Sequence, residues 1–314
     1  MASVVRVLPL LGAGVGAAAV RRRFGNEMAA ARARIAAVGP RVVVTARGLV
    51  EYAERGEGSP VLGVHGVFGG CDQGLLLAAE SVGEGFRVIA PSRFGYLGSP
   101  LPSDATPAAQ ADVFVALLDA LQLERVPVVA HSAGATSALQ LALRHADRIT
   151  GLALISPNAP GLELTVPPKP VARALFGSDL TFWLLARYRH AHPESMLGVP
   201  NGYKLNSEDV QSLRALMDTM LPARPRRDGA LFDAFVSNRD VDEYRLEAIG
   251  IPTLVVGARD DPLTLYLNVA AMAQRIPGAR LLTLEHGGHT LLGGGERVRH
   301  ELGAFLAQAA TTRA

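Results

Sequence analysis

The sequence predicts an α/β fold with a mostly parallel, doubly wound sheet and a helical cap insertion. Short, nearly continuous apolar runs, which are typical of buried parallel strands, alternate with longer helical patterns. A long block without a strand pattern, from Pro157 to about Arg245, interrupts this alternation. Of the 314 residues, 49% are hydrophobic and 19% are charged, so the chain can bury a sizeable core and is not a disordered protein.

The amino-terminal segment, residues 1–40, combines an apolar stretch with a basic, alanine-rich stretch. Val7–Val20 is uncharged and is followed by three arginines. As a helix it would span about 21 Å, less than the ~30 Å hydrocarbon core of a membrane. Three interpretations stay open: a short membrane anchor, a signal peptide, or a helix that packs on the body or frays. The basic cluster would keep an anchored body in the cytoplasm. We expect a cytoplasmic protein with at most weak membrane association through residues 1–23, and a solvated helical arm over Phe24–Val38.

Strand and helix candidates follow in turn. Two β-rich runs flank Arg47-Gly48, a two-residue hairpin signal. The strand candidates are Arg41–Ala46, Leu49–Glu54, Val61–His65, Phe86–Ala90, Val126–Ala130, Leu152–Ser156, Pro252–Ala258 and Arg280–Leu284. The helix candidates between them are Pro107–Leu121, with Thr106 as N-cap, Ala133–His145 and Leu267–Arg275. Ligands of such sheets bind at the carboxyl ends of the strands.

The block without strands contains its own helical patterns, over Val171–Tyr188, Ser207–Leu221 and Gly229–Asn238. It is too long for a plain loop, so we interpret it as a helical cap. The predicted division is therefore an amino-terminal segment (1–40), a core (41–157 and 246–311) and a cap (158–245).

The turn around Ser132 carries the first chemical signal. Ala130-His131-Ser132-Ala133-Gly134 lies between a predicted strand and a predicted helix, the context of a G-x-S-x-G nucleophile turn. Small residues are needed two positions before and after the serine because strand and helix come close there. Gly134 fits, and Ala130 replaces the first glycine. The alternative is an ordinary turn with an incidental serine.

Two further parts of the sequence supply the other groups that a catalytic serine needs: donors for an oxyanion, an acid and a histidine. The glycine-rich loop His65–Gly70 can offer the backbone N–H of Val67, beside that of Ala133, to an oxyanion. We interpret His65 as structural and Cys71 as a buried bystander. Downstream, one strand ends in Asp260-Asp261 and the next in His286-Gly287-Gly288-His289, so the order is serine, acid, histidine.

These pieces, in this order, resemble the α/β-hydrolase superfamily over roughly residues 49–308. The matching segments are VLGVHGVFGG, FRVIAPSRFGYLGSP, VVAHSAGATSALQLALRHADRI, IPTLVVGARDDPLT and LEHGGH. The resemblance implies that Ser132 is the nucleophile, His289 the general base, and Val67 and Ala133 the oxyanion hole. The family's acid usually falls seven residues after the leucine of the P-T-L strand, which favours Asp261; counting from Gly257 as the family's glycine selects Asp260 instead. His289 is favoured over His286 because it follows the glycine pair.

The expected activity is hydrolysis of a small or lipophilic carboxylic ester through an acyl-enzyme. The alternatives are an acyltransferase or carbon–carbon hydrolase with the same triad, or a non-catalytic binding protein on this scaffold. Serine at position 132 argues against dehalogenases and epoxide hydrolases of this fold, which use aspartate. The aromatic residues of the cap either line an acyl pocket or pack against the body, and we expect Phe68 and Trp183 to bind substrate.

Composition excludes several other classes. The net charge is +2 without a basic stripe, so no nucleic-acid partner is expected. A single cysteine allows neither an intrachain disulfide nor a cysteine zinc site. His190 and His192 are interpreted as solvated side chains and not as metal ligands. We expect a small-molecule acyl substrate, no metal and no cofactor, and the sequence does not determine the oligomeric state.

Overall fold

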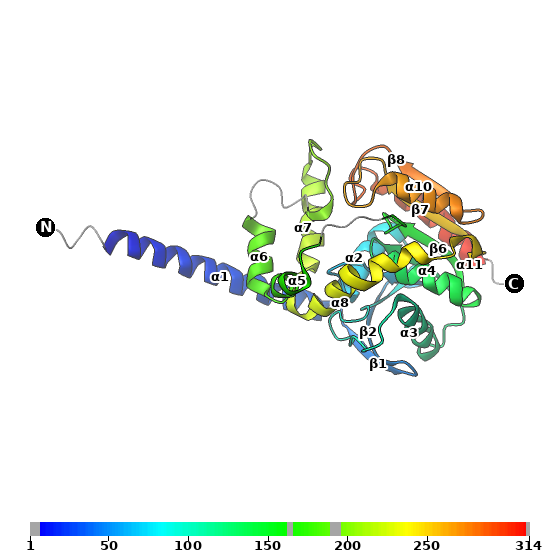
Figure 1. Cartoon of the computed structure of the whole chain (residues 1–314), viewed down its shortest axis with the longest axis horizontal. Coiled ribbons are helices and arrows are strands. Elements are labelled where there is room, and N and C mark those ends of the chain that lie inside the picture. Colours follow the sequence, from blue (N-terminus) through cyan, green and yellow to red (C-terminus); the bar gives the residue numbers. More distant parts are fainter. Residues whose placement is uncertain (1–6, 162–165, 189–195, 312–314) are drawn as a thin grey trace.

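The computed structural model describes residues 7–161, 166–188 and 196–311, and its centre is an eight-stranded sheet (Figure 1). The strand order is β1-β2-β4-β3-β5-β6-β7-β8. The β1–β2 and β2–β4 pairs are antiparallel, and all other pairs are parallel. The strands are β1 (Arg41–Thr45), β2 (Gly48–Arg55), β3 (Ser59–Val64), β4 (Phe86–Pro91), β5 (Val126–His131), β6 (Ile149–Ile155), β7 (Thr253–Ala258) and β8 (Arg280–Leu284). The predicted mostly parallel sheet is therefore confirmed.

Helices cover both faces of this sheet, because successive strand side chains point to opposite sides. On one face, Val128 and Leu154 belong to a core cluster with residues of three helices, α3 (Pro107–Ala120), α4 (Gly134–Arg144) and α10 (Tyr266–Arg275). On the other face, Val129 and Ile155 pack with α2 (Cys71–Val82) and α11 (Gly295–Thr311). The strands at the centre thus bury both faces, which explains their continuous apolar sequence.

Two core helices were not predicted, and the start of one strand differs by three residues from its predicted position. The helices α2 and α11 carry several glycines and charged residues near their starts, which weakens their helical pattern. The strand β6 begins at Ile149, earlier than expected, because Ile149 and Gly151 pair with Val126 and Pro127 of β5. Neighbouring strands, more than local sequence, set this boundary.

The segment between β6 and β7 is helical, as predicted. It contains α5 (Lys169–Phe176), α6 (Asp179–Tyr188), α7 (Ser207–Thr219), α8 (Arg227–Phe232), the π-helix Asp233–Ser237 and α9 (Asn238–Asp240). Short 3₁₀ turns occur at Ala146–Arg148, Arg224–Arg226, Val241–Glu243 and Leu246–Ala248. The expected helix over Val171–Tyr188 is divided in two, because Ser178 accepts a hydrogen bond from the backbone N–H of Thr181 and starts a new helix. We call residues 166–245 the cap, and its status as a separate domain stays a prediction.

The amino-terminal segment forms one helix, α1 (Val7–Ala37), which projects from the body beside α5 and α6 (Figure 1). The expected solvated helical arm over Phe24–Val38 is helical to Ala37 and mostly exposed, but one side of it packs against the cap. Met28 and Ala31 are buried in the cluster that contains the cap aromatics, and the Phe24 ring lies 5.5 Å from that of Trp183. Within the described parts of the chain, no helix is both long and apolar enough to cross a membrane.

Candidate active site

Ser132 occupies a strained turn between β5 and α4. Its φ of 49° lies in the left-handed region that non-glycine residues rarely adopt. Gly134 is required here, because a Cβ at that position would lie 2.5 Å from the carbonyl oxygen of His65. Ala130 is fully buried in the adjoining strand, so its methyl group is accommodated. The turn places the serine hydroxyl at the carboxyl edge of the sheet, beside the start of a helix.

Ser132, His289 and Asp261 form a continuous hydrogen-bonded chain. His289 Nε2 lies 2.9 Å from Ser132 Oγ, and His289 Nδ1 lies 2.9 Å from Asp261 Oδ2. Thr264 donates to Asp261 through both its hydroxyl, at 2.7 Å, and its backbone N–H, at 3.0 Å. Burial raises the pKa of Asp261, but the hydrogen bonds from His289 and Thr264 and the charge of His289 outweigh it, so the net pKa is lowered. Asp261 is therefore ionised and can stabilise an imidazolium.

The neighbouring Asp260 has a different environment. Its carboxylate accepts hydrogen bonds from the backbone N–H groups of Gly287 and Gly288, at 3.3 and 2.9 Å. His286 Nδ1 lies 3.6 Å from it, and this histidine is 83% exposed. Asp260 thus supports the turn that presents His289, while Asp261 contacts the imidazole itself.

The glycine-rich loop lies directly against the serine. A Cβ on Gly66 would be 3.3 Å from Ser132 Cβ, and Val67 lines the same pocket as Ser132. His65 is fully buried, accepts a hydrogen bond from the backbone N–H of Arg93, and has a pKa well below its usual range because of burial and the Arg93 charge. Burial and the nearby Glu51 raise the pKa of Cys71 to about 12, so this thiol is a poor nucleophile.

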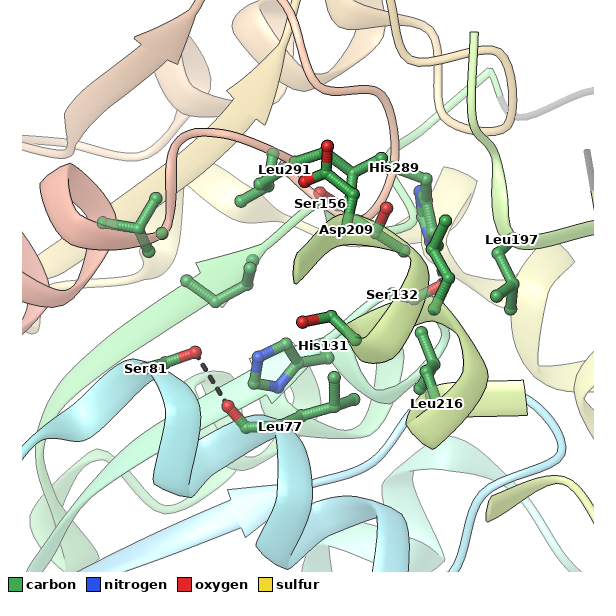
Figure 2. Close-up of a pocket in the computed structure, with 18 of the residues that line it drawn as sticks. Leu77, Ser81, His131, Ser132, Ser156, Leu197, Asp209, Leu216, His289 and Leu291 are labelled. Carbon is green, nitrogen blue, oxygen red and sulfur yellow. Dashed lines mark hydrogen bonds between the residues drawn. The ribbon is translucent and has the colours of Figure 1, made fainter. Parts of the chain in front are cut away.

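Ser132 and His289 open into a pocket of about 710 Å³ (Figure 2). Its walls come from α2, β6, α7 and the segment that follows β8. Large apolar side chains form much of the wall, beside polar ones: Leu77, Ile155, Met196, Leu197, Leu213, Leu216, Met220, Leu263, Leu291, Leu292 and Val298. Such a pocket can hold an acyl chain or another apolar group next to the serine.

Residues 59–295 match the family model of the alpha/beta hydrolase fold. The chain belongs to this family. It is 32% identical over 213 residues to RutD of Caulobacter sp. (strain K31), provisionally named a carbamate hydrolase, covering 65% of this chain and 74% of that protein. It is 29% identical over 266 residues to the 2-hydroxymuconate semialdehyde hydrolase of Pseudomonas putida, covering 82% of this chain and 90% of that protein.

A solved structure is similar over most of the chain. The alpha/beta hydrolase fold protein from Nakamurella multipartita has a TM-score of 0.72 and 30% identity, covering 87% of this chain and 100% of that chain. The relatives are named hydrolases, and this chain is likewise an alpha/beta hydrolase. The names of these relatives differ in substrate, so the family by itself assigns none.

The structure places Phe68 and Trp183, which were predicted to bind substrate, in the packing of the cap. Phe68 packs 4.8 Å from both Phe176 and Phe182, and Trp183 is fully buried with its indole N–H donated to Glu27 at 2.7 Å. Neither side chain is part of the Ser132 pocket wall. These aromatics instead pack the cap together and attach α1 to it. His190 and His192 lie outside the described residues.

The cap wall of the pocket was missed by sequence analysis. Leu213, Leu216 and Met220 line the pocket from α7 and the residue that follows it. Their spacing of three and then four residues is the signal that could have found them, because it places them on one face of a helix. Within the described residues, no group of histidine, cysteine and acidic side chains is arranged to hold a metal ion.

Two buried arginines fix the loop of this hydrolase that carries Val67. Arg93 donates to the carbonyl oxygens of His65 and Gly66, each at 3.1 Å, and forms a bidentate pair with Asp233 of the cap. Arg226 of the cap donates to the Gly69 carbonyl and pairs with Asp72 at 2.7 Å. The cap and the loop are therefore joined by buried, charge-assisted hydrogen bonds.

Proposed function

We propose that this hydrolase cleaves carboxylic esters through an acyl-enzyme formed on Ser132. The observation that carries the proposal is the hydrogen-bonded chain from Ser132 through His289 to Asp261, with 2.9 Å at both histidine nitrogens, beside an apolar-walled pocket. In this proposal Ser132 is the nucleophile, His289 the general base and acid, and Asp261 the residue that orients and stabilises the imidazolium.

The reaction would proceed in two steps. His289 Nε2 takes the Ser132 proton while Oγ attacks the ester carbonyl carbon, and the tetrahedral intermediate collapses as His289 protonates the leaving alcohol. Water then enters, loses a proton to His289 and releases the acid from Ser132. The lowered pKa of Asp261 supports its part, because an ionised carboxylate favours the charged imidazole at each step.

The oxyanion would be held by the backbone N–H groups of Val67 and Ala133. Ala133 follows Ser132 at the start of α4, and Val67 lies in the loop that passes against the serine. Donors on two rigidly held segments need little rearrangement during the reaction. Removing one such donor typically lowers kcat by about 10²–10³-fold.

The decisive experiment combines fluorophosphonate labelling with turnover of short- and medium-chain p-nitrophenyl esters. Wild type is compared with Ser132→Ala and with Ser103→Ala, a control serine exposed in a loop. We expect Ser132→Ala to lose labelling and to lower kcat by about 10⁴-fold or more, while Ser103→Ala behaves like wild type. Labelling of Ser132 without ester turnover would favour an acyltransferase or a carbon–carbon hydrolase with the same triad. No labelling of folded wild type would favour a binding protein.

A further inference from the structure

The Ser132 pocket contains buried polar atoms that no group of the described residues satisfies. His131 is 7% exposed and Ser156 is 2% exposed, yet neither His131 Nε2 nor Ser156 Oγ has a hydrogen-bond partner among the described residues. Both side chains line the pocket, as does Thr290, whose hydroxyl is also unpartnered in the described structure. Buried polar atoms are nearly always paired with protein, water or a ligand, so these atoms require a partner that enters the pocket, either water or a polar group of a substrate.

The two side chains approach the pocket from different elements. In the view of Figure 2, His131 lies toward Leu77 and Ser81 of α2, whereas Ser156 lies toward Leu291 and His289. Ser156 follows β6 with a φ of 43°, and its backbone N–H donates to the Val256 carbonyl at 2.8 Å. The hydroxyl is therefore carried on a strained residue that the neighbouring strand holds in place.

His131 is an uncharged partner at physiological pH. Burial lowers its pKa to about 3, and the charge of His289 contributes in the same direction. A neutral imidazole has one N–H donor and one acceptor nitrogen. This imidazole and the Ser156 hydroxyl can each hydrogen-bond a hydroxyl or a keto oxygen at its own place in the pocket, and neither supplies a positive charge.

The remaining ionisable groups of the pocket disfavour an anionic ligand. Three carboxylates, from Glu208, Asp209 and Glu296, line the pocket, against one guanidinium, from Arg299. A negatively charged substituent would meet like charge here. The chemistry of the lining thus selects a neutral oxygen on an otherwise apolar chain.

We propose that this hydrolase prefers esters whose acyl chain carries a neutral hydroxyl or keto oxygen, which His131 and Ser156 hydrogen-bond. The inference rests on the proposed ester hydrolysis and specifies its substrate class. An unsubstituted alkyl chain leaves both polar atoms buried without partners, and sites built to hydrogen-bond a substrate group discriminate strongly against analogues that lack it.

The test measures kcat/KM for p-nitrophenyl hexanoate and for its 3-hydroxy, 4-oxo and 5-oxo derivatives. We expect wild type to favour at least one oxygenated ester by about tenfold or more. In each of the two single variants, Ser156→Ala and His131→Leu, the ratio of kcat/KM for the preferred oxygenated ester to that for the hexanoate should fall to within about threefold of unity. Because the preference is a ratio of two kcat/KM values, a loss of activity that affects both esters equally does not change it. Thr150→Val is the matched control, because Thr150 also carries a buried, unpartnered hydroxyl but lies outside the pocket wall; it should keep the wild-type ratio.

The outcomes separate this inference from the proposed function. A wild-type enzyme that hydrolyses hexanoate as well as every oxygenated ester overturns the substrate preference while leaving ester hydrolysis intact. If no ester is hydrolysed, the proposed function fails, and binding to Ser132→Ala is measured by calorimetry with methyl hexanoate and its 3-hydroxy, 4-oxo and 5-oxo derivatives. Tighter binding of an oxygenated ester, lost on adding Ser156→Ala, supports the polar subsite; equal binding of all four esters overturns it.

Discussion

Adjacent aspartates after β7 show how a single residue position decides a chemical role. Asp261 lies 2.9 Å from the imidazole of His289, whereas Asp260 accepts backbone hydrogen bonds from Gly287 and Gly288. The two carboxylates contact different partners although they are adjacent in the turn that follows β7. Only one of them can therefore orient the base.

Replacing these aspartates one at a time should separate the two roles. We expect Asp261→Asn to lower kcat for ester hydrolysis by about 10⁴-fold, because an amide cannot stabilise the imidazolium and favours the wrong tautomer. Asp260→Asn keeps an oxygen acceptor for the glycine N–H groups and should stay within about tenfold of wild type. Steady-state kinetics of both variants checks this, and equal losses would contradict the assignment.

Two buried histidines should make the fold sensitive to mild acid. The pKa of His131 is lowered to about 3 and that of His65 well below its usual range, in both cases mainly by burial. In the unfolded chain both titrate near 6.5. Below that pH the unfolded state binds protons that the folded state does not, so the free energy of unfolding falls as pH falls.

Between pH 7 and pH 5.5, we expect each of these histidines to lower the free energy of unfolding by about 1 kcal/mol. Urea unfolding of wild type and of His131→Leu at both pH values measures it. The variant should lose about 1 kcal/mol less than wild type over this interval. The same pH dependence in both proteins would show that His131 is protonated in the folded state.

At the scale of elements, one carboxylate in the contact between α1 and the cap has several partners. Glu27 accepts hydrogen bonds from the Trp183 indole at 2.7 Å, from Arg187 at 2.8 Å and from Arg23 at 2.9 Å. Arg34, nearer the end of α1, donates to the backbone carbonyls of Asp218 and Leu221, close to the residues of α7 that line the pocket. Thus α1 supports the cap wall from outside.

Glu27→Ala should loosen this attachment. We expect the free energy of unfolding to fall by roughly 1–3 kcal/mol, because polar groups in the α1–cap contact lose their acceptor. Trp183 is the only tryptophan and is fully buried, so its fluorescence reports on this contact directly. In the variant, the Trp183 emission should shift to the red, and acrylamide should quench it more strongly. Glu57→Ala, in an exposed turn, is the control and should change neither property.

At the scale of the whole molecule, the cap is joined to the core by buried ion pairs. Arg226 and Asp72 are both almost fully buried and 2.7 Å apart, and Arg93 pairs with Asp233 at 2.6 Å. Each pair joins a residue of the cap to a residue beside the glycine-rich loop. Movement of the cap would therefore disturb the segment that carries Val67.

Removing one partner of a buried pair leaves an uncompensated charge, which typically costs about 3–5 kcal/mol. We expect Arg226→Met to destabilise the protein by this amount and the double variant Arg226→Met/Asp72→Leu to be clearly less destabilised. Arg280→Met breaks a half-exposed surface pair with Glu301 and should cost less than about 1 kcal/mol. Denaturant unfolding of the three variants tests this, and a double variant as unstable as the single one would contradict it.

Much of the architecture could be predicted because it depends on local pattern. Strand β8 has the predicted bounds, Arg280–Leu284, and the other strands differ only at their ends. The turns around Ser132 and His289 were found because close backbone approach and positive φ restrict residue type, as at Gly134 and Gly288. What was missed involves packing partners: the pocket-facing side of α7, the side of α1 that packs on the cap, and the position of Trp183, whose aromatic character fits a pocket and a core equally well.

The sequence by itself determined the alternation of strands and helices, the serine–acid–histidine order and the family, since periodicity and glycine positions act over a few residues. Only the tertiary structure decided that Asp261 contacts His289, that Trp183 donates to Glu27, and that His131 and Ser156 are buried in the pocket with no partner for their side chains among the described residues. Each of these depends on contacts between segments far apart in the chain. Burial and hydrogen-bond satisfaction are properties of the assembled fold, so no local pattern specifies them.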